Sequence, residues 1–392
     1  VQTKEKVKKN TRPLHSDPNG NNVNSNLVPT ATGKGLNMKP YGLDEFINGM
    51  TQGFLAPRGY FKTAEAATQT ETMAALGINF TALVVNQFQE TFGSTRIFPD
   101  NARTVSDDEL RLQIDRLHKH GIRVMLKPML EPLDSLWRGH IRHASGNILA
   151  DVVTDNAALW FASYREFLRR YAEIATETGC EMFCIGCELD GMEIHRQHWS
   201  NCIRLVRSLY PGVITYNLTM NITDFSECRR WLSELDLVGV SGYFKVGPKD
   251  RSIPLSQMVE NWQPWRDKLE AFAQWLQKPL FFAETGARPQ VGAAGITGDY
   301  NDGLAVYSER DQSDYYLSTV TTFRNEPWFY GTVWWKWDEH QYRPNYHLSD
   351  GHYIGCEPAP EMRHTMKTWC AGGKIPRPEL RPVLSPVNRS DA

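Results

Sequence analysis

The sequence predicts a (β/α)8 barrel, and three observations point to this fold. Eight short runs rich in β-branched and aromatic residues alternate with long amphipathic stretches, which is the pattern of parallel βα units. Three junctions, at Gly77, Gly121 and Gly179, share the order helix, glycine, strand. A doubly wound sheet would have fewer strands and usually an early phosphate loop, and the sequence contains no G-x-G-x-x-G motif. We therefore expect one α/β domain, a TIM barrel over residues 41–373.

Local signals set the bounds of the expected elements. Ser106 and Glu109 form a capping box that begins a helix, and this helix ends at Gly121. The strand-like runs are 46–54, 80–88, 123–130, 181–189, 213–219, 236–244, 279–286 and 329–337. Further helices are expected at 160–178, 196–209, 255–277, 312–323 and 360–369, and the barrel fold itself implies a helix after each strand.

The segments outside the expected strands and helices fall into tails and long loops. Residues 1–40 are rich in Lys, Asn, Ser, Thr, Pro and Gly without periodicity, which predicts a flexible N-terminal arm. Residues 374–392 are Pro-rich and predict a C-terminal tail rather than a domain. The long connections 131–156 and 287–311 follow strands, so they are expected at the C-terminal face of the barrel, where substrates bind.

Composition excludes several classes of protein. The 392 residues include 43 Lys+Arg and 45 Asp+Glu, and this near-neutral balance argues against a nucleic-acid-binding protein. No apolar run approaches the ~20 residues that a membrane-spanning helix needs. The 12 Trp residues exceed what core packing usually requires. Aromatic faces suit sugar rings, although an aromatic-rich core explains the count equally well.

The seven cysteines do not form the pattern of a disulfide framework. Cys184 and Cys187 have C-x-x-C spacing, but no second pair follows them, so we interpret them as residues of a buried strand rather than as a metal or redox site. The missing initiator Met at Val1 and the linker-like arm favour export, whereas free cysteines favour a reducing compartment. Compartment and oligomeric state are left open.

Two carboxylates at predicted strand ends are the main candidates for catalysis. Glu188 ends the fourth strand-like run and Glu284 ends the seventh, each after an apolar stretch where an unpaired charge is costly. These strands lie roughly across the mouth of a barrel, so the two side chains can converge over its centre. Retaining glycoside hydrolysis needs such a pair, one carboxyl protonated as acid and the other ionised as nucleophile. The alternative is that each caps a strand or pairs with a nearby arginine.

Aromatic side chains near the other strand ends could bind a sugar. The run 334–337 of the last strand has three Trp in four positions, of which two should face inward. Tyr243 ends the sixth run, where its hydroxyl could orient the Glu284 carboxylate. The aromatic candidates for substrate binding are Trp137, Tyr243, Trp335 and Trp337.

Polar side chains at three more strand ends could bind sugar hydroxyls. Lys127 ends the third run, and Asn86 and Asn217 end the second and fifth. Lys127 could equally form a salt bridge, and the amides could equally bind loop backbone.

Two other groups of residues are weaker candidates for a functional site. Glu193, His195 and His198 resemble a metal cluster but have no further ligand in view, so no metal or other cofactor is expected. Asp338 and Glu339 are adjacent, and adjacent residues point apart in an extended chain.

At these residues the sequence resembles the glycoside hydrolases of clan A, most closely family 113, the β-1,4-mannanases. The similarity extends from Gly49 to about Glu284. The string at 183–189 (FCIGCEL) is the most specific, and the others are 49–51, 59–61, 104–107, 124–128, 137–139, 215–216 and 236–240. The resemblance implies a retaining mechanism with Glu188 as acid/base and Glu284 as nucleophile, no metal, and mannan-type β-1,4 substrates.

The sequence departs from the family pattern at two places. Most of clan A has Asn before the acid/base, where it contacts the sugar 2-hydroxyl, and family 113 typically has Thr, whereas this chain has Cys187. A thiol is a poor hydrogen-bond partner, so another β-linked glycan is the alternative substrate. After Pro128 the family usually has a His-rich turn with an acid, whereas this chain has Met129-Leu130-Glu131.

Two alternatives from other classes complete the predictions. A barrel that binds glycan without cutting it would commonly have lost a carboxylate of the pair. A metal-dependent hydrolase would need several His at strand ends, and the sequence offers none there. The expected partner is therefore an oligosaccharide or polysaccharide substrate.

Overall fold

The computed structural model describes residues 45–144, 147–149, 152–298, 306–337 and 356–370. Eight parallel strands close a barrel in the order β1-β10-β9-β8-β7-β6-β3-β2, which confirms the predicted (β/α)8 fold. The strands are β1 (Ile47–Gln52), β2 (Phe80–Gln89), β3 (Arg123–Pro132), β6 (Met182–Cys187), β7 (Val213–Leu218), β8 (Val238–Ser241), β9 (Leu280–Thr285) and β10 (Phe329–Trp334).

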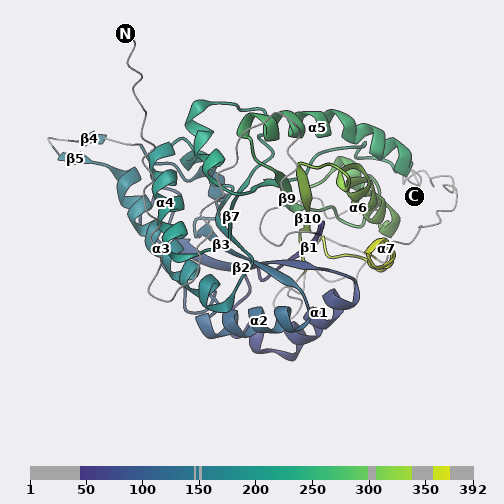
Figure 1. Ribbon diagram of the computed structural model, residues 1–392, viewed down its shortest axis with the longest axis horizontal. Coiled ribbons are helices and arrows are strands. Elements are labelled where there is room, and N and C mark those ends of the chain that lie inside the picture. Colours follow the sequence, from purple (N-terminus) through teal and green to yellow (C-terminus); the bar gives the residue numbers. More distant parts are fainter. Residues whose placement is uncertain (1–44, 145–146, 150–151, 299–305, 338–355, 371–392) are drawn as a thin grey trace, which may run out of the picture. The chain divides into compact units, whose positions relative to one another are not determined.

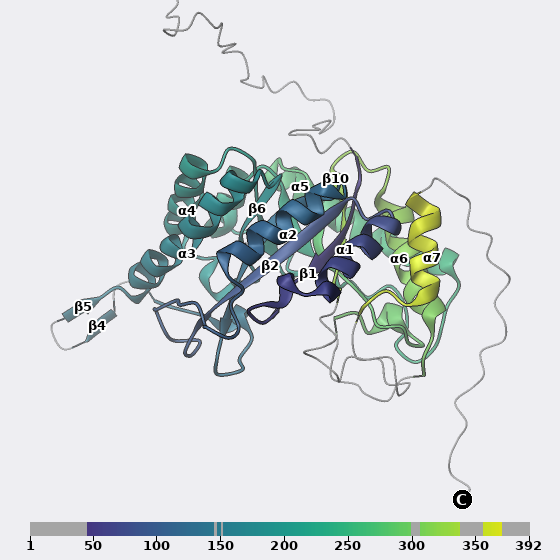
Figure 2. The ribbon, with the colours of Figure 1, turned by 90° about the horizontal axis from the view of Figure 1, so that it is seen from below.

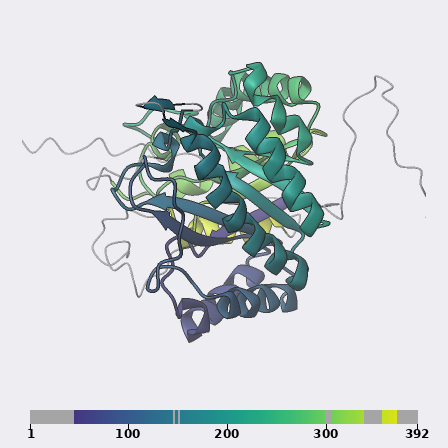
Figure 3. The ribbon, with the colours of Figure 1, turned by 90° about the vertical axis from the view of Figure 1, so that its left-hand side faces the viewer.

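Helices surround the strands of the barrel (Figure 1). In Figure 3, α3 and α4 lie in front of the strands, so these helices cover that side of the barrel. The α-helices are α1 (Ala64–Ala75), α2 (Asp107–Lys119), α3 (Asn156–Thr178), α4 (Arg196–Leu209), α5 (Leu255–Leu276), α6 (Glu309–Phe323) and α7 (Pro360–Cys370). The 3-10 helices are η1 (Tyr60–Lys62), η2 (Arg138–His140), η3 (Asp190–Met192), η4 (Glu227–Glu234) and η5 (Ala293–Gly295).

The predicted helix signals act as expected. The Ser106 side chain accepts from the Glu109 N–H and the Glu109 carboxylate accepts from the Ser106 N–H, so the capping box of α2 is complete. Helix α3 begins four residues earlier than predicted because the Asp155 side chain caps it. It ends at Gly179, which takes the left-handed conformation at φ 70° that glycine adopts without strain.

Two connections differ from the prediction. Between β7 and β8 the chain forms the 3-10 helix η4 rather than an α-helix, and the buried side chains of Arg229 and Trp231 anchor it by donating to the carbonyls of Asn221 and Glu193. The loop after β3 contains a short antiparallel hairpin, β4 (Asn147–Leu149) and β5 (Val152–Thr154). Figures 1 and 2 both draw this hairpin outside the ring of helices.

The barrel interior is filled in layers. The layer nearer the N-terminal ends of the strands includes Phe80, Met125, Met182 and Phe281, and these four side chains are fully buried. A strand alternates its side chains with period two, so β3 places Lys127 on the same side as Met125, one layer higher. This register explains how a lysine comes to lie in the barrel interior with none of its surface exposed.

Several predictions lie outside the described residues. These are the N-terminal arm 1–40, the Pro-rich tail 374–392 and the pair Asp338 and Glu339. The described residues all belong to one unit, residues 36–392. None of the helices described has the length and apolar character that crossing a bilayer demands.

Candidate active site

Glu188 and Glu284 lie at the C-terminal ends of two barrel strands. Glu188 is the first residue after β6, and Glu284 is the fifth residue of β9. Three steps around the barrel separate these strands, through β7 and β8. The Glu284 residue is 3% exposed and the Glu188 side chain 12% exposed, so both carboxyls are largely withdrawn from water.

A continuous set of hydrogen bonds joins the two carboxyls. The Lys127 Nζ donates to Glu284 Oε1 at 2.5 Å and to Asn217 Oδ1 at 2.7 Å. Asn217 Nδ2 donates to Ser241 Oγ at 3.0 Å. Ser241 Oγ in turn donates to Glu188 Oε1 at 2.6 Å. The strands β3, β7 and β8 therefore each contribute one residue that fixes the relative position of the pair.

Three hydrogen-bond donors surround the Glu284 carboxylate. Its Oε1 accepts from Lys127 and from the Cys187 thiol, whose Sγ lies 3.3 Å away, and its Oε2 accepts from the Tyr243 hydroxyl at 3.2 Å. Burial alone would lower the pKa of Lys127, but the acidic groups of Cys187 and Glu284 outweigh it and raise this pKa above its ordinary value. Lys127 is thus a permanent cation beside the carboxylate.

The surroundings of Glu188 shift its pKa upward. Burial and the negative charge of Glu284 raise the pKa of Glu188, although the Arg138 guanidinium opposes them. Glu188 Oε2 accepts from Arg138 Nη1 at 2.8 Å and from the Trp137 indole N–H at 3.2 Å. Glu284 thus lies beside a buried cation, whereas burial and a neighbouring carboxylate raise the pKa of Glu188, and this asymmetry suits a nucleophile paired with an acid.

Arg138 is itself held in place by a second carboxylate. Its Nε donates to Glu131 Oε1 at 2.8 Å and its Nη2 donates to the same oxygen at 2.5 Å. Burial raises the pKa of Glu131, and the charge of Arg138 works against this effect. Arg138 therefore links Glu131, at the end of β3, to Glu188 at the end of β6.

Trp335 forms an aromatic wall beside Glu284. It is 8% exposed and belongs to a buried cluster with Met129, Cys187 and Tyr243. Its ring centroid lies 5.8 Å from Lys127 Nζ. Because Cys187 and Tyr243 both donate to Glu284, this wall stands next to the carboxylate.

The other predicted binding residues are more scattered. Trp337 packs in the main core with the Arg363 guanidinium 4.8 Å above its ring, away from the contacts of Glu188 and Glu284. Asn86 accepts from the Leu55 N–H, while its buried Nδ2 has no partner among the described residues. Trp137 is 41% exposed and stands at the rim.

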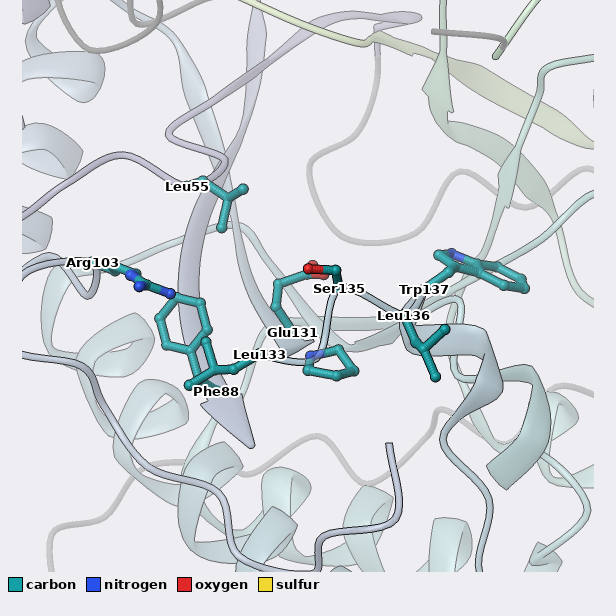
Figure 4. Close-up of a pocket in the computed structure, with 9 residues that line it drawn as sticks. Leu55, Phe88, Arg103, Glu131, Leu133, Ser135, Leu136 and Trp137 are labelled. Atoms are coloured by element: carbon teal, nitrogen blue, oxygen red, sulfur yellow. The ribbon is translucent and has the colours of Figure 1, made fainter. Parts of the chain in front are cut away.

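A pocket of about 530 Å³ opens next to this group. Figure 4 shows Leu55 pointing from one wall toward Glu131 and Ser135, with Trp137 at one end and Arg103 beside Phe88 at the other. Trp137 lines this pocket and also donates to Glu188, so the pocket adjoins the Glu188 carboxyl. Among the described residues, no group of three or more His, Cys, Asp and Glu side chains is arranged to hold a metal ion.

Sequence reasoning did not assign roles to Ser241, Arg138 and Glu131. Ser241 stands two residues before Tyr243, at a strand end that was already singled out, so the signal was available. Arg138 reaches Glu188 from a different loop, 50 residues away in the sequence, and no period or motif indicates that contact.

We expect the substitution Glu284→Gln to lower the pKa of Glu188. The substitution removes the negative charge that, after burial, raises this pKa, and it leaves Arg138 in place to lower it. Carbon-13 NMR titration of labelled glutamate carboxyls would follow the change, with Glu188→Gln identifying the resonance. The surface change Glu177→Gln is the control. A Glu188 pKa that stays constant or rises would contradict the coupling of the two groups.

The closed barrel and the carboxyl pair at its mouth define a class of protein, the barrel-type glycoside hydrolases. The chain belongs to Glycoside Hydrolase Family 113, whose family model matches residues 50–356. It is an enzyme of this class, and the resemblance noted in the sequence is confirmed. No curated protein matches the sequence.

Solved structures agree with the family assignment. A GH113 β-1,4-mannanase in a complex is 26% identical, with 83% of this chain and 99% of that chain covered and a TM-score of 0.70. The GH113 β-mannanase AaManA from Alicyclobacillus acidocaldarius, in complex with ManMIm, is 28% identical, with 84% and 99% covered and a TM-score of 0.69. A family 5 mannosidase from Rhizomucor miehei shares the fold at 13% identity, with 84% and 94% covered and a TM-score of 0.58.

Proposed function

We propose that this glycoside hydrolase is a retaining β-mannanase that cleaves β-1,4-mannan or manno-oligosaccharides. The observation that carries the proposal is the hydrogen-bonded chain from Glu284 through Lys127, Asn217 and Ser241 to Glu188. This chain of hydrogen bonds brings two carboxyls to one site in different surroundings, as double displacement by an acid and a nucleophile requires. The substrate is suggested by the β-mannanases of the same family that the structure resembles.

In the first step, Glu284 attacks the anomeric carbon. Its Oε1 accepts from Lys127 and Cys187 and its Oε2 from Tyr243, so we assign the attack to Oε2. Glu188, whose pKa is raised by burial and by Glu284, acts as the acid and gives its proton to the leaving oxygen. The C–O bond to the leaving sugar breaks as the bond to Glu284 forms.

In the second step, water replaces Glu284. Glu188, now ionised and stabilised by Arg138, takes a proton from the water as its oxygen attacks the anomeric carbon. The bond to Glu284 breaks, and the free carboxylate returns to its ion pair with Lys127. Two inversions at the same carbon give a product with the β configuration.

A substrate panel with product analysis tests the proposal. Mannan, glucomannan, cellulose, xylan and galactan would be incubated with the enzyme, and proton NMR would follow the anomer released first. We expect mannan to be cleaved fastest and the β anomer to appear before mutarotation. Preference for another glycan would overturn the substrate, and an initial α anomer would overturn the retaining mechanism.

The pocket beside Trp137 leads us to expect a dependence on chain length. Leu55 is 37% exposed and points into this pocket, so Leu55→Ala should remove apolar contact with a sugar bound beyond the cleaved bond. We expect kcat/KM to fall roughly fivefold to tenfold for long manno-oligosaccharides and little for the shortest ones cleaved. Leu112→Ala, at a leucine of α2 that is 38% exposed, is the matched control. An equal loss at every chain length would contradict the assignment.

A further inference from the structure

A buried carboxylate that the proposed mechanism does not use lies behind Glu188. Glu193 follows η3, five residues after Glu188, and it is 6% exposed. Its Oε2 lies 3.0 Å from the Nε of Arg229, which is 2% exposed. Burial raises the pKa of Glu193 to about 7, against the effect of the Arg229 charge. A buried ion pair is costly to form, so its presence so near Glu188 in the sequence requires an explanation.

Tyr216 connects Glu193 to the backbone of the site. The Tyr216 hydroxyl donates to Glu193 Oε1 at 3.1 Å and accepts from the Leu189 N–H at 2.9 Å. Burial, with the nearby Glu193, raises the pKa of Tyr216 well above its ordinary value, so the phenol keeps the proton that it donates. Leu189 is the residue immediately after Glu188, so this bond holds the peptide unit that follows Glu188.

The peptide unit before Glu188 is held as well. The Glu188 N–H donates to the Asn217 carbonyl at 2.8 Å. Glu188 has φ of 52°, a left-handed conformation that a residue other than glycine adopts only when its surroundings impose it. The two flanking N–H groups, bonded to neighbouring residues of β7, fix this conformation. The direction of the Glu188 side chain therefore depends on Asn217 and Tyr216.

Close packing keeps the Tyr216 ring in place. A Cβ at Gly186 would lie 2.6 Å from the ring, so only glycine allows β6 to approach it this closely. The Trp199 and Trp231 rings stack with their centroids 4.8 Å apart, and each meets the Tyr216 ring edge-on. Their indole N–H groups donate to the carbonyls of Met192 and Glu193, at 2.9 and 3.0 Å, so the same rings anchor the turn that follows Glu188.

We propose that Tyr216, held by Glu193, is a positioning residue that aims the Glu188 carboxyl at the leaving oxygen. The inference rests on the proposed role of Glu188 as acid/base. It assigns a function to a buried tyrosine and a buried carboxylate that make no contact with the proposed nucleophile Glu284 among the described residues. Loss of the Tyr216 hydroxyl should therefore affect proton transfer and leave nucleophilic attack intact.

The dependence on the leaving group tests this inference. Tyr216→Phe keeps the ring and removes only the hydroxyl. We expect its kcat/KM to fall about tenfold to a hundredfold on manno-oligosaccharides, whose departing oxygen needs a proton. On a 2,4-dinitrophenyl β-mannobioside, whose leaving group departs without protonation, we expect kcat/KM within about twofold of the wild type. Glu193→Gln, which leaves Tyr216 an oxygen acceptor, should show the same pattern with smaller losses.

Tyr210→Phe is the matched control, because the Tyr210 hydroxyl is also buried and donates to the Cys180 carbonyl at 2.7 Å, before β6 begins. It should not change the ratio of the two rates. Equal losses of Tyr216→Phe on both substrates, or no loss on either, would overturn the positioning role. A wild-type enzyme that cleaves no β-mannoside would instead overturn the proposed substrate, and the comparison would then use aryl glycosides of the sugar found in the substrate panel.

Discussion

Glu284→Ala is expected to lower kcat/KM on mannan by about 10⁵-fold, because the variant has no group that can attack the anomeric carbon. Lys127 would also lose its anionic partner while it stays fully buried, so the variant should unfold at a lower temperature than the wild type. Glu284→Gln offers Lys127 a neutral oxygen in the same place. We expect it to be equally inactive and to unfold at a temperature closer to that of the wild type.

Azide can identify the role of the lost group. In Glu284→Ala the cavity lies on the α face of a β-mannoside, so added azide should enter there and form the α-mannosyl azide when the leaving group is activated. Glu357→Ala is the control for loss of a buried carboxylate elsewhere, since Glu357 pairs with Arg363 outside this group. Wild-type rates in Glu284→Ala would contradict the assignment of the nucleophile.

The sequence was sufficient to predict the barrel and the carboxyl pair because both depend on local periodicity. Strand-like runs end at the mouth of the barrel, and an isolated carboxylate at the end of such a run can be recognised in the sequence. The positions of Glu188 and Glu284 at two strand ends could therefore be predicted, whereas their catalytic roles belong to the proposed function. The bond from Lys127 to Glu284 also follows from a regular feature, the period of two along β3, although the sequence left a sugar contact equally open.

The contacts made by loops could not be predicted in this way. Arg138 comes from the 3-10 helix η2, whose position depends on the Glu131 ion pair and on packing rather than on a repeat. The three tryptophans of the last strand show the same limit. Strand β10 ends at Trp334, so alternation no longer holds beyond it. Trp335 alone lies beside Lys127, while Trp334 and Trp337 join the main core.

Glu188→Ala is expected to remove the acid and base while leaving the nucleophile in place, whereas Glu284→Ala removes the nucleophile. With the proton donor lost, kcat/KM on manno-oligosaccharides should fall about 10³-fold. The rate of formation of the glycosyl-enzyme from a 2,4-dinitrophenyl β-mannobioside should be nearly unchanged, because Glu284 and Lys127 stay in place. The intermediate should then accumulate, since the group that deprotonates water is also gone, and a burst of dinitrophenol would report it.

The stereochemistry of the azide product separates the two carboxyls. In Glu188→Ala, azide needs no general base and should attack the glycosyl-enzyme from the β face, opposite to the bond with Glu284, which gives the β-mannosyl azide. The two alanine variants thus remove carboxyls from opposite faces of the same sugar, and their azide products should differ in configuration. An α azide from Glu188→Ala and a β azide from Glu284→Ala would exchange the two roles. The raised pKa of Glu188 and the Lys127 cation beside Glu284 both argue against that exchange.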